Sequence, residues 1–171
     1  EGTKKFFREL NRLGMTGVVD PGGNNLLPSD YQALFQVWRQ GQMTMRVAYT
    51  LCSNNTGAEF EEYKNLTQLL PMGFGDGMLK FNGLGERITA AMNNNNRPSA
   101  TDKEKYAQIV KWAAERGMSL TMHWGNDASV NQLLDIFEAV NKEVPIKDLR
   151  WSIAHLNDAS EQNLRRMKAL G

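Results

Sequence analysis

The fold is decided by a strand–helix–strand stretch at residues 119–155, which reads SLTMHWGNDASVNQLLDIFEAVNKEVPIKDLRWSIAH. Residues 119–124 are a short apolar run typical of a buried strand, and apolar side chains then recur at helical spacing from about residue 129 to residue 141. A second strand is predicted over residues 149–155. Two strands separated by one helix predict a βαβ unit, whose strands run parallel.

The same alternation continues on both sides of this unit. Further strands are predicted over residues 16–20, 44–50 and 78–82, and further helices over residues 6–13, 29–41, 56–70, 101–117 and 160–169. Strands that alternate with helices form parallel sheets with right-handed crossovers. Five strands and six helices fit either an open doubly wound sheet or an arc of a (β/α)8 barrel.

The two ends of the chain favour the barrel. A Leu-Gly pair, Leu13–Gly14, leads from a helix into the first strand, whereas no strand follows the same pair at Leu170–Gly171. The first helix also lacks a strand before it. A complete barrel needs about 250 residues, and this chain has 171. We therefore expect an α/β fold, a partial (β/α)8 TIM barrel with five parallel strands and flanking helices, in a single domain (residues 1–171) that is incomplete at both ends.

Composition excludes several classes of partner and site. Twenty basic and nineteen acidic residues give a formal charge of +1, which offers no electrostatic basis for binding nucleic acid or an anionic membrane. No apolar run approaches the ~20 residues that span a bilayer, and the start of the chain does not resemble a signal peptide. The single cysteine, Cys52, rules out an internal disulfide framework and a cysteine zinc site. The compartment stays open, with the cytoplasm favoured.

The chain has two histidines, and each closes a predicted strand. His123 ends the strand at residues 119–124 and His155 ends the strand at residues 149–155. Ligands bind at the carboxyl ends of parallel strands, and neighbouring strands lie only ~4.8 Å apart. Two imidazoles there predict a shared metal ion, while the alternative is a pair of strand-end residues bonded to nearby loops. By alternation, His123 shares a face with Thr121, and His155 shares a face with Ile153.

Lys80 and Asp127 complete the candidate set. Lys80 lies within an apolar strand, where it either reaches solvent at an edge or serves near the mouth of the barrel as a base, a Schiff-base lysine or a carboxylated metal ligand. A carboxylated lysine has two oxygens and can bridge two cations. Asp127 follows His123 by four residues, just before a helix, and an aspartate in that place is ordinarily a helix cap.

Four segments together resemble amidohydrolase family 3 of the metal-dependent amidohydrolase superfamily. They are LGMTGVVD at residues 13–20, MLKFNG at 78–83, HWGND at 123–127 and LRWSIAH at 149–155. The resemblance covers nearly the whole chain, from the second barrel strand to the helix after the sixth. It implies a (β/α)8 barrel that holds one or two divalent metal ions, usually zinc, at its carboxyl-terminal mouth.

The resemblance also implies roles for individual residues. Lys80 would be the strand-four lysine, which is carboxylated in many members, and His123 and His155 would be the metal ligands of strands five and six. Asp127 matches a catalytic aspartate of the family, although the glycine that precedes it comes one place early, at Gly125. Glu86 is a candidate for an acidic role near the metals. The His-x-His pair of strand one and the aspartate of strand eight have no counterpart in this chain.

Two functions follow as expectations. The first is a metal-dependent hydrolase of an amide or other C–N bond in a small molecule, of which this chain is an incomplete part that is inactive when isolated. The alternative is a doubly wound domain that binds a ligand or partner without catalysis. An open barrel arc also leaves two sheet edges unpaired, so we expect self-association through these edges.

Overall fold

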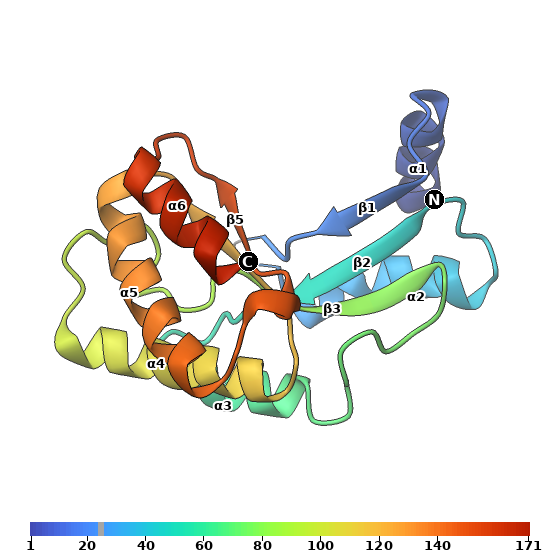
Figure 1. Cartoon of the computed structure of the whole chain (residues 1–171). Helices are drawn as coiled ribbons and strands as arrows, with labels where there is room; N and C mark the ends of the chain where they lie inside the picture. The colour runs from blue at the N-terminus through green and yellow to red at the C-terminus, as the bar shows by residue number, and fades with distance from the viewer. Residues whose placement is uncertain (24–25) are drawn as a thin grey trace.

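The computed structural model describes residues 1–23 and 26–171. Strands and helices alternate along the whole chain, as Figure 1 shows. The elements are α1 (Gly2–Arg12), β1 (Gly17–Asp20), η1 (Pro28–Tyr31), α2 (Gln32–Arg39), β2 (Arg46–Leu51), α3 (Glu59–Leu66), β3 (Leu79–Glu86), α4 (Ala100–Glu115), β4 (Leu120–Trp124), α5 (Asp127–Glu143), η2 (Lys147–Leu149), β5 (Ser152–His155) and α6 (Glu161–Leu170).

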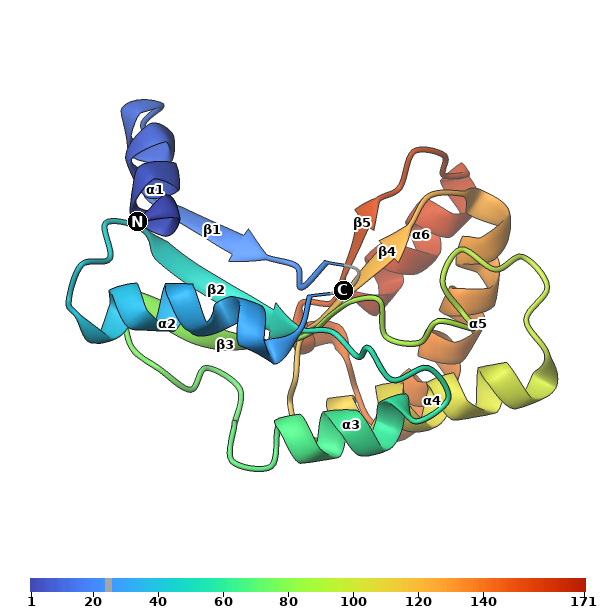
Figure 2. The same ribbon diagram turned by 180° about the vertical axis from the view of Figure 1, so that it is seen from behind.

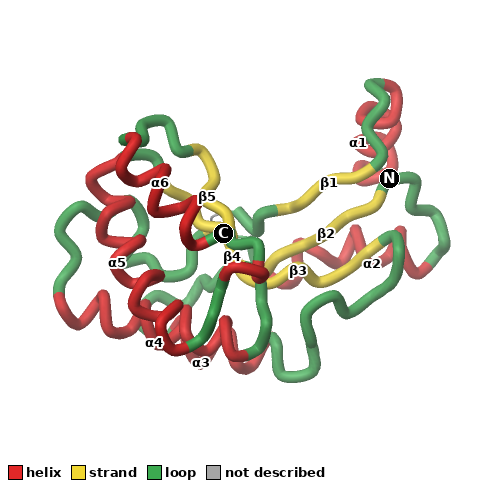
Figure 3. The backbone as a smooth tube through the Cα atoms, viewed as in Figure 1, coloured by secondary structure: helices red, strands yellow, loops and turns green. Residues whose placement is uncertain are grey.

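The five strands form one parallel sheet in the order β1-β2-β3-β4-β5. A doubly wound sheet reverses its strand order at a switch point, so this sequential order excludes that alternative and confirms the partial barrel. The sheet curls from β1 to β5, and the two opposite views in Figures 1 and 2 show α2, α3, α4 and α5 following one side of the curve. The strands form a continuous bent band in Figure 3.

Alternation along the strands divides the sheet into a packed face and an open face. One face is buried against the helices by side chains such as Val47, Tyr49, Leu79, Phe81, Leu120 and Met122. The other face carries exposed side chains, among them Val19, which is 60% exposed, and Lys80. In a closed barrel this second face is the interior, so the open face of this arc is the inner wall of a partial barrel.

β3 is longer than its predicted span of residues 78–82. It continues to Glu86 through Gly83 and Gly85, and its register against β2 shifts by one residue, from Tyr49↔Phe81 to Leu51↔Leu84. Only glycine fits at position 83, because φ there is +97° and an added Cβ would lie 2.0 Å from the main-chain oxygen of Ser119 in the chain leading to β4. Gly83 and Gly85, which lie beyond the predicted end of the strand, are therefore points of close contact within it.

Two helices begin earlier than predicted because other residues cap them. α4 starts at Ala100 since Ser99 and Asp102 cap each other, with Ser99 Oγ accepting from Asp102 N at 3.2 Å and Asp102 Oδ2 accepting from Ser99 N at 3.2 Å. α5 starts at Asp127 because Asn126 Oδ1 accepts from Ser129 N at 3.0 Å. Each cap satisfies main-chain N–H groups that the first helical turn leaves without partners.

The two outer strands, β1 and β5, are the edges of this sheet. Each pairs on one side, and the main-chain groups on its other side are available to another strand. Self-association through these edges stays a prediction. No helix among the described residues has the length and apolar character needed to cross a membrane.

Candidate metal centre

Three side chains from three neighbouring strands meet at the carboxyl ends of those strands. Glu86 Oε2 lies 3.2 Å from His123 Nδ1 and 3.1 Å from His155 Nε2. The two imidazole centroids are 4.3 Å apart, with their planes inclined by 60°. A single carboxylate oxygen therefore lies between two imidazole nitrogens, each on a different ring.

The parallel sheet is what brings these residues together. Glu86 is the last residue of β3, His123 is the fourth of the five residues of β4, and His155 is the last residue of β5. The three strands are adjacent and point the same way, so residues that are 37 and 69 positions from Glu86 in sequence reach one edge. The two histidines therefore lie together at this edge, as the sequence predicts.

The orientation of His155 differs from the prediction based on alternation. His155 pairs with Trp124, and Ile153 pairs with the buried Met122 on the helix side of the sheet. Simple alternation would send the imidazole to that same side. Instead His155 has φ of +71°, a left-handed conformation that ends the strand. Its side chain consequently reaches Glu86 rather than sharing the face of Ile153.

Exposure is graded across the three side chains. The Glu86 side chain is 11% exposed, His123 is 27% exposed and His155 is 49% exposed. A carboxylate with so little access to water needs a positive or hydrogen-bonding partner, and within residues 1–23 and 26–171 the two imidazoles are the side chains that contact it through polar atoms. The cluster is thus closed on the β3 side and open to solvent on the β5 side.

The donor set matches what a divalent metal requires. One ligand atom from each of Glu86, His123 and His155 lies within 4.8 Å of the other two. Two imidazole nitrogens and one carboxylate oxygen are a common protein ligand set for catalytic zinc, which keeps a further coordination position open. The three residues fit a divalent metal ion, and they are the residues that would hold it.

Lys80 does not lie with this cluster. It is the second residue of β3, exposed on the open face, and pairs with Ala48 of β2. Glu86 comes six positions later on the same strand, which corresponds to roughly 20 Å at the ordinary strand rise. The structure therefore places the lysine toward the opposite end of the sheet from the two histidines. Its side chain is exposed to solvent, which agrees with the first of the two interpretations given for it above. Its carboxylation stays a prediction of the resemblance.

The Asp127 carboxylate forms hydrogen bonds with the start of α6. Its Oδ1 accepts hydrogen bonds from Ser160 N at 2.7 Å and from Asn163 Nδ2 at 2.8 Å, which ties the first residue of α5 to the first turn of α6. The hydrogen bond from Ser160, followed by that from Asn163, lowers the pKa of Asp127. The carboxylate thus joins two helices, and its catalytic role stays a prediction.

Replacing Asp127 with alanine tests which role it has. We expect a lower free energy of unfolding near neutral pH and an unchanged zinc affinity, because the lost hydrogen bonds join α5 to α6. Since the folded pKa is depressed, the stabilisation is present above the unfolded value of ~3.9 and is lost as pH falls through the folded value. Urea unfolding near neutral pH and in acid measures this, with the exposed Asp148→Ala as control. A loss of zinc binding with unchanged stability would contradict the joining role.

The sequence alone does not indicate a definite role for Glu86. The glycines at positions 83 and 85 made the segment resemble a loop, so Glu86 was not recognised as the end of a strand. One signal was available: Glu86 is an acidic residue shortly after a predicted strand, near the end of the sheet where the two histidines lie. Extending the strand through the glycines would have placed it beside them.

A parallel, sequentially ordered arc with a carboxylate and two imidazoles at its carboxyl edge is a partial (β/α)8 barrel with a candidate metal centre. The sequence profile described as the Amidohydrolase family matches residues 1–171, and the chain belongs to that family. No curated protein was found to match it.

Two solved structures share the fold. One is an uncharacterized metal-dependent hydrolase from Pyrococcus horikoshii OT3, with 19% identity and a TM-score of 0.63, and the alignment covers 98% of this chain and 34% of that one. The other is an uncharacterized metal-dependent hydrolase from Pyrococcus furiosus, with 21% identity and a TM-score of 0.64, covering 98% and 35%. This chain spans about a third of the length of each of these structures.

Proposed function

We propose that this chain forms part of the catalytic barrel of a metal-dependent hydrolase that acts on an amide or other C–N bond of a small molecule. The observation that carries the proposal is the convergence of Glu86, His123 and His155 at the carboxyl edge of the parallel sheet. Membership of the Amidohydrolase family and the fold shared with two metal-dependent hydrolases support it.

The three residues have separate tasks in this proposal. Glu86 is the anchor, because its carboxylate is nearly buried and contacts both rings. The nitrogens that face this carboxylate, Nδ1 of His123 and Nε2 of His155, are the ones that would bind the metal beside it. When bound, a divalent metal such as zinc, as one ion or two, supplies Lewis-acid polarisation of a carbonyl and a lowered pKa for water. The more exposed His155 leaves the β5 side open for a small molecule to approach.

Metal content before and after substitution of each histidine tests the proposal. We expect the purified protein to contain zinc, manganese or iron by elemental analysis, and His123→Ala and His155→Ala to lose most of it, because these are the chain's two imidazoles. Thr121→Ala is the matched control, since Thr121 lies two residues before His123 on the same strand and bonds to Ser152. Unchanged or negligible metal in all four proteins would contradict the metal centre and favour a non-catalytic binding domain.

Hydrolysis provides the second readout. We expect turnover of N-acylated or cyclic amides by the natural full-length protein to disappear on chelation and to return with zinc. Turnover that persists in metal-free protein would contradict the proposed chemistry even if metal binds.

A further inference from the structure

Arg87 follows Glu86 directly but extends toward a different part of the sheet edge. It is partly buried, and its one side-chain hydrogen bond within residues 1–23 and 26–171 runs from Nη2 to the main-chain oxygen of Ser53, at 3.3 Å. Ser53 comes two residues after the end of β2. The guanidinium of Arg87 is therefore held near the end of β2, on the same carboxyl edge as the candidate metal centre.

Among the described residues, other parts of the protein use little of the hydrogen-bonding capacity of this guanidinium. Arginine has five N–H donors, and one of them is bonded to Ser53. In the part of the chain that the structure describes, no carboxylate forms an ion pair with Arg87. The other nitrogens of Arg87 are not enclosed in the protein interior, so an anion from outside the chain can reach them.

Arg166 is an arginine with a structural role, and its hydrogen-bond partners can be compared with those of Arg87. Its side chain is 19% exposed, and it bonds to Asp135 at 2.7 Å, to Glu138 at 2.7 Å and to Asn131 at 3.1 Å. Every nitrogen of that guanidinium has a partner. Arg87 has no comparable set among the described residues, which separates it from an arginine that only joins helices.

The surroundings of Arg87 are rigid. The buried Tyr63 hydroxyl donates to the main-chain oxygen of Arg87 at 3.0 Å and accepts from Ser53 N at 3.0 Å. Glu62 Oε2 accepts from Ser53 Oγ at 2.5 Å and from Asn54 N at 2.9 Å. These donors occupy Oε2 of Glu62 in α3, so this carboxylate organises the loop after β2, and no ion pair between it and Arg87 is found among the described residues. These contacts hold the main chain of Arg87 and of its partner Ser53 in place, which lowers the entropy cost of ordering this region around a ligand.

We propose that Arg87 binds a carboxylate of the substrate, so that the substrate is a small organic acid that also carries the C–N bond to be cleaved. This rests on the function proposed above. A guanidinium recognises a carboxylate through two parallel N–H···O hydrogen bonds, and Arg87 has the free donors for them. The ends of β2 and β4 are two interstrand spacings apart, roughly 10 Å. The carboxylate and the C–N bond are therefore several bonds apart in the substrate rather than adjacent.

Paired probes that differ only in charge test this assignment. The probes are ω-amido acids from succinamate to adipamate, each compared with its neutral diamide, and binding to the zinc-loaded natural full-length protein is measured by calorimetry. We expect each acid to bind roughly 10-fold or more tightly than its diamide, the effect of a charge-assisted hydrogen bond. Arg87→Gln should abolish that preference, and Arg87→Lys should retain part of it because the charge remains.

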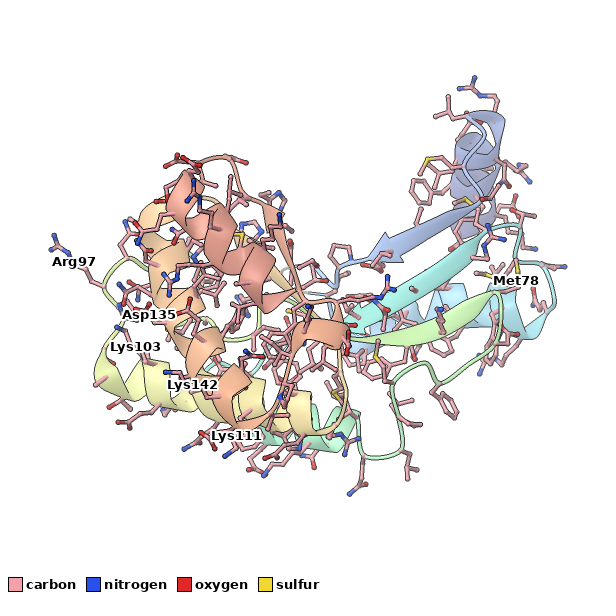
Figure 4. All side chains as sticks on the ribbon, viewed as in Figure 1. Met78, Arg97, Lys103, Lys111, Asp135 and Lys142 are labelled. Atoms are coloured by element: carbon pink, nitrogen blue, oxygen red, sulfur yellow. The ribbon has the colours of Figure 1, made fainter. Side chains whose placement is uncertain are left out.

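Arg97→Gln is the matched control. Arg97 lies in the same loop between β3 and α4, but its side chain is exposed and extends outward from the loop (Figure 4). We expect this variant to keep the full preference for the acids. Thermal unfolding is measured for the unchanged protein and the three variants. It shows whether loss of the hydrogen bond to Ser53 destabilises the protein.

The outcomes separate this proposal from the metal centre. A preference for the acids that survives Arg87→Gln, or equal binding of acid and diamide to the unchanged protein, would overturn the role of Arg87. Equal weakening of both probes in Arg87→Gln would assign Arg87 a purely structural role and overturn it as well. Zinc affinity is measured on the same samples, so either of these results with zinc still bound refutes Arg87 alone. A preference for the acids without zinc binding supports Arg87 and refutes the hydrolase.

Discussion

We expect the Glu86→Gln variant to bind zinc on the order of 100-fold more weakly than the unchanged protein. Losing a residue that only supports a metal ligand already costs ~10–100-fold in affinity, and Glu86 is proposed as a ligand itself. Glutamine has nearly the same size, so the substitution changes the charge of the side chain and leaves its volume. Glu86 contacts both imidazoles and is the one carboxylate of the three-residue cluster. Its replacement removes one of the three ligands and the one negative charge among them.

Competition titration with a zinc-binding dye measures this affinity. Glu104→Gln is the matched control. Glu104 is exposed on α4, and its substitution changes the net charge of the protein by the same amount. We expect the control to keep the affinity of the unchanged protein. Equal zinc affinities for Glu86→Gln and Glu104→Gln would refute Glu86 as a ligand and leave at most the two histidines at the site.

Gly83→Ala is expected to lower the free energy of unfolding by about 3 kcal/mol or more, since strained backbone and a core clash act together. Position 83 has φ of +97°, and the new Cβ would lie 2.0 Å from the main-chain oxygen of Ser119. That oxygen accepts the hydrogen bond from Leu84 N at 3.0 Å, which begins the pairing of β3 with β4. The methyl group can be accommodated only if the two strands separate.

The same substitution should also weaken zinc binding, because Glu86 reaches His123 only through the pairing of β3 with β4. Gly77→Ala is the control, since a Cβ added at that position would have no atom within 4 Å and its φ is not in the left-handed region. Urea denaturation followed by circular dichroism compares the two variants. A Gly83→Ala protein as stable as Gly77→Ala would contradict the described course of β3.

The architecture could be predicted from the sequence because its signals are local and repeated. Apolar runs separated by amphipathic helices predict parallel strands, and the number and order of these runs fit a barrel arc. The positions of His123 and His155 at strand ends follow from the same pattern. Parallel strands then require the two imidazoles to share one edge, whatever lies between them in the sequence.

The details of the site depend on contacts that a local pattern does not contain. Gly83 favours a loop when judged alone, and only its close approach to Ser119 shows why a strand needs glycine there. The side chain of His155 leaves the face predicted by alternation because its own backbone is left-handed. In both cases tertiary contacts override the local preference. The local pattern therefore indicates no definite role for Glu86, and the face that it predicts for His155 is wrong.

Lys80 and Asp127 illustrate a different difficulty. Each residue type is compatible with metal chemistry, and each lies within a motif of the family. Lys80 is at the start of its strand, however, and the oxygen of Asp127 is occupied by Ser160 and Asn163. The position along a strand and the partners of a carboxylate are properties of the folded chain, so a motif alone does not determine them.

The most direct measurement is anomalous diffraction at the zinc absorption edge from crystals of the zinc-loaded protein. We predict an anomalous peak bounded by Glu86, His123 and His155, with metal–nitrogen distances of about 2.0–2.1 Å. A zinc ion bound elsewhere, with these three side chains still bonded only to one another, would contradict this prediction.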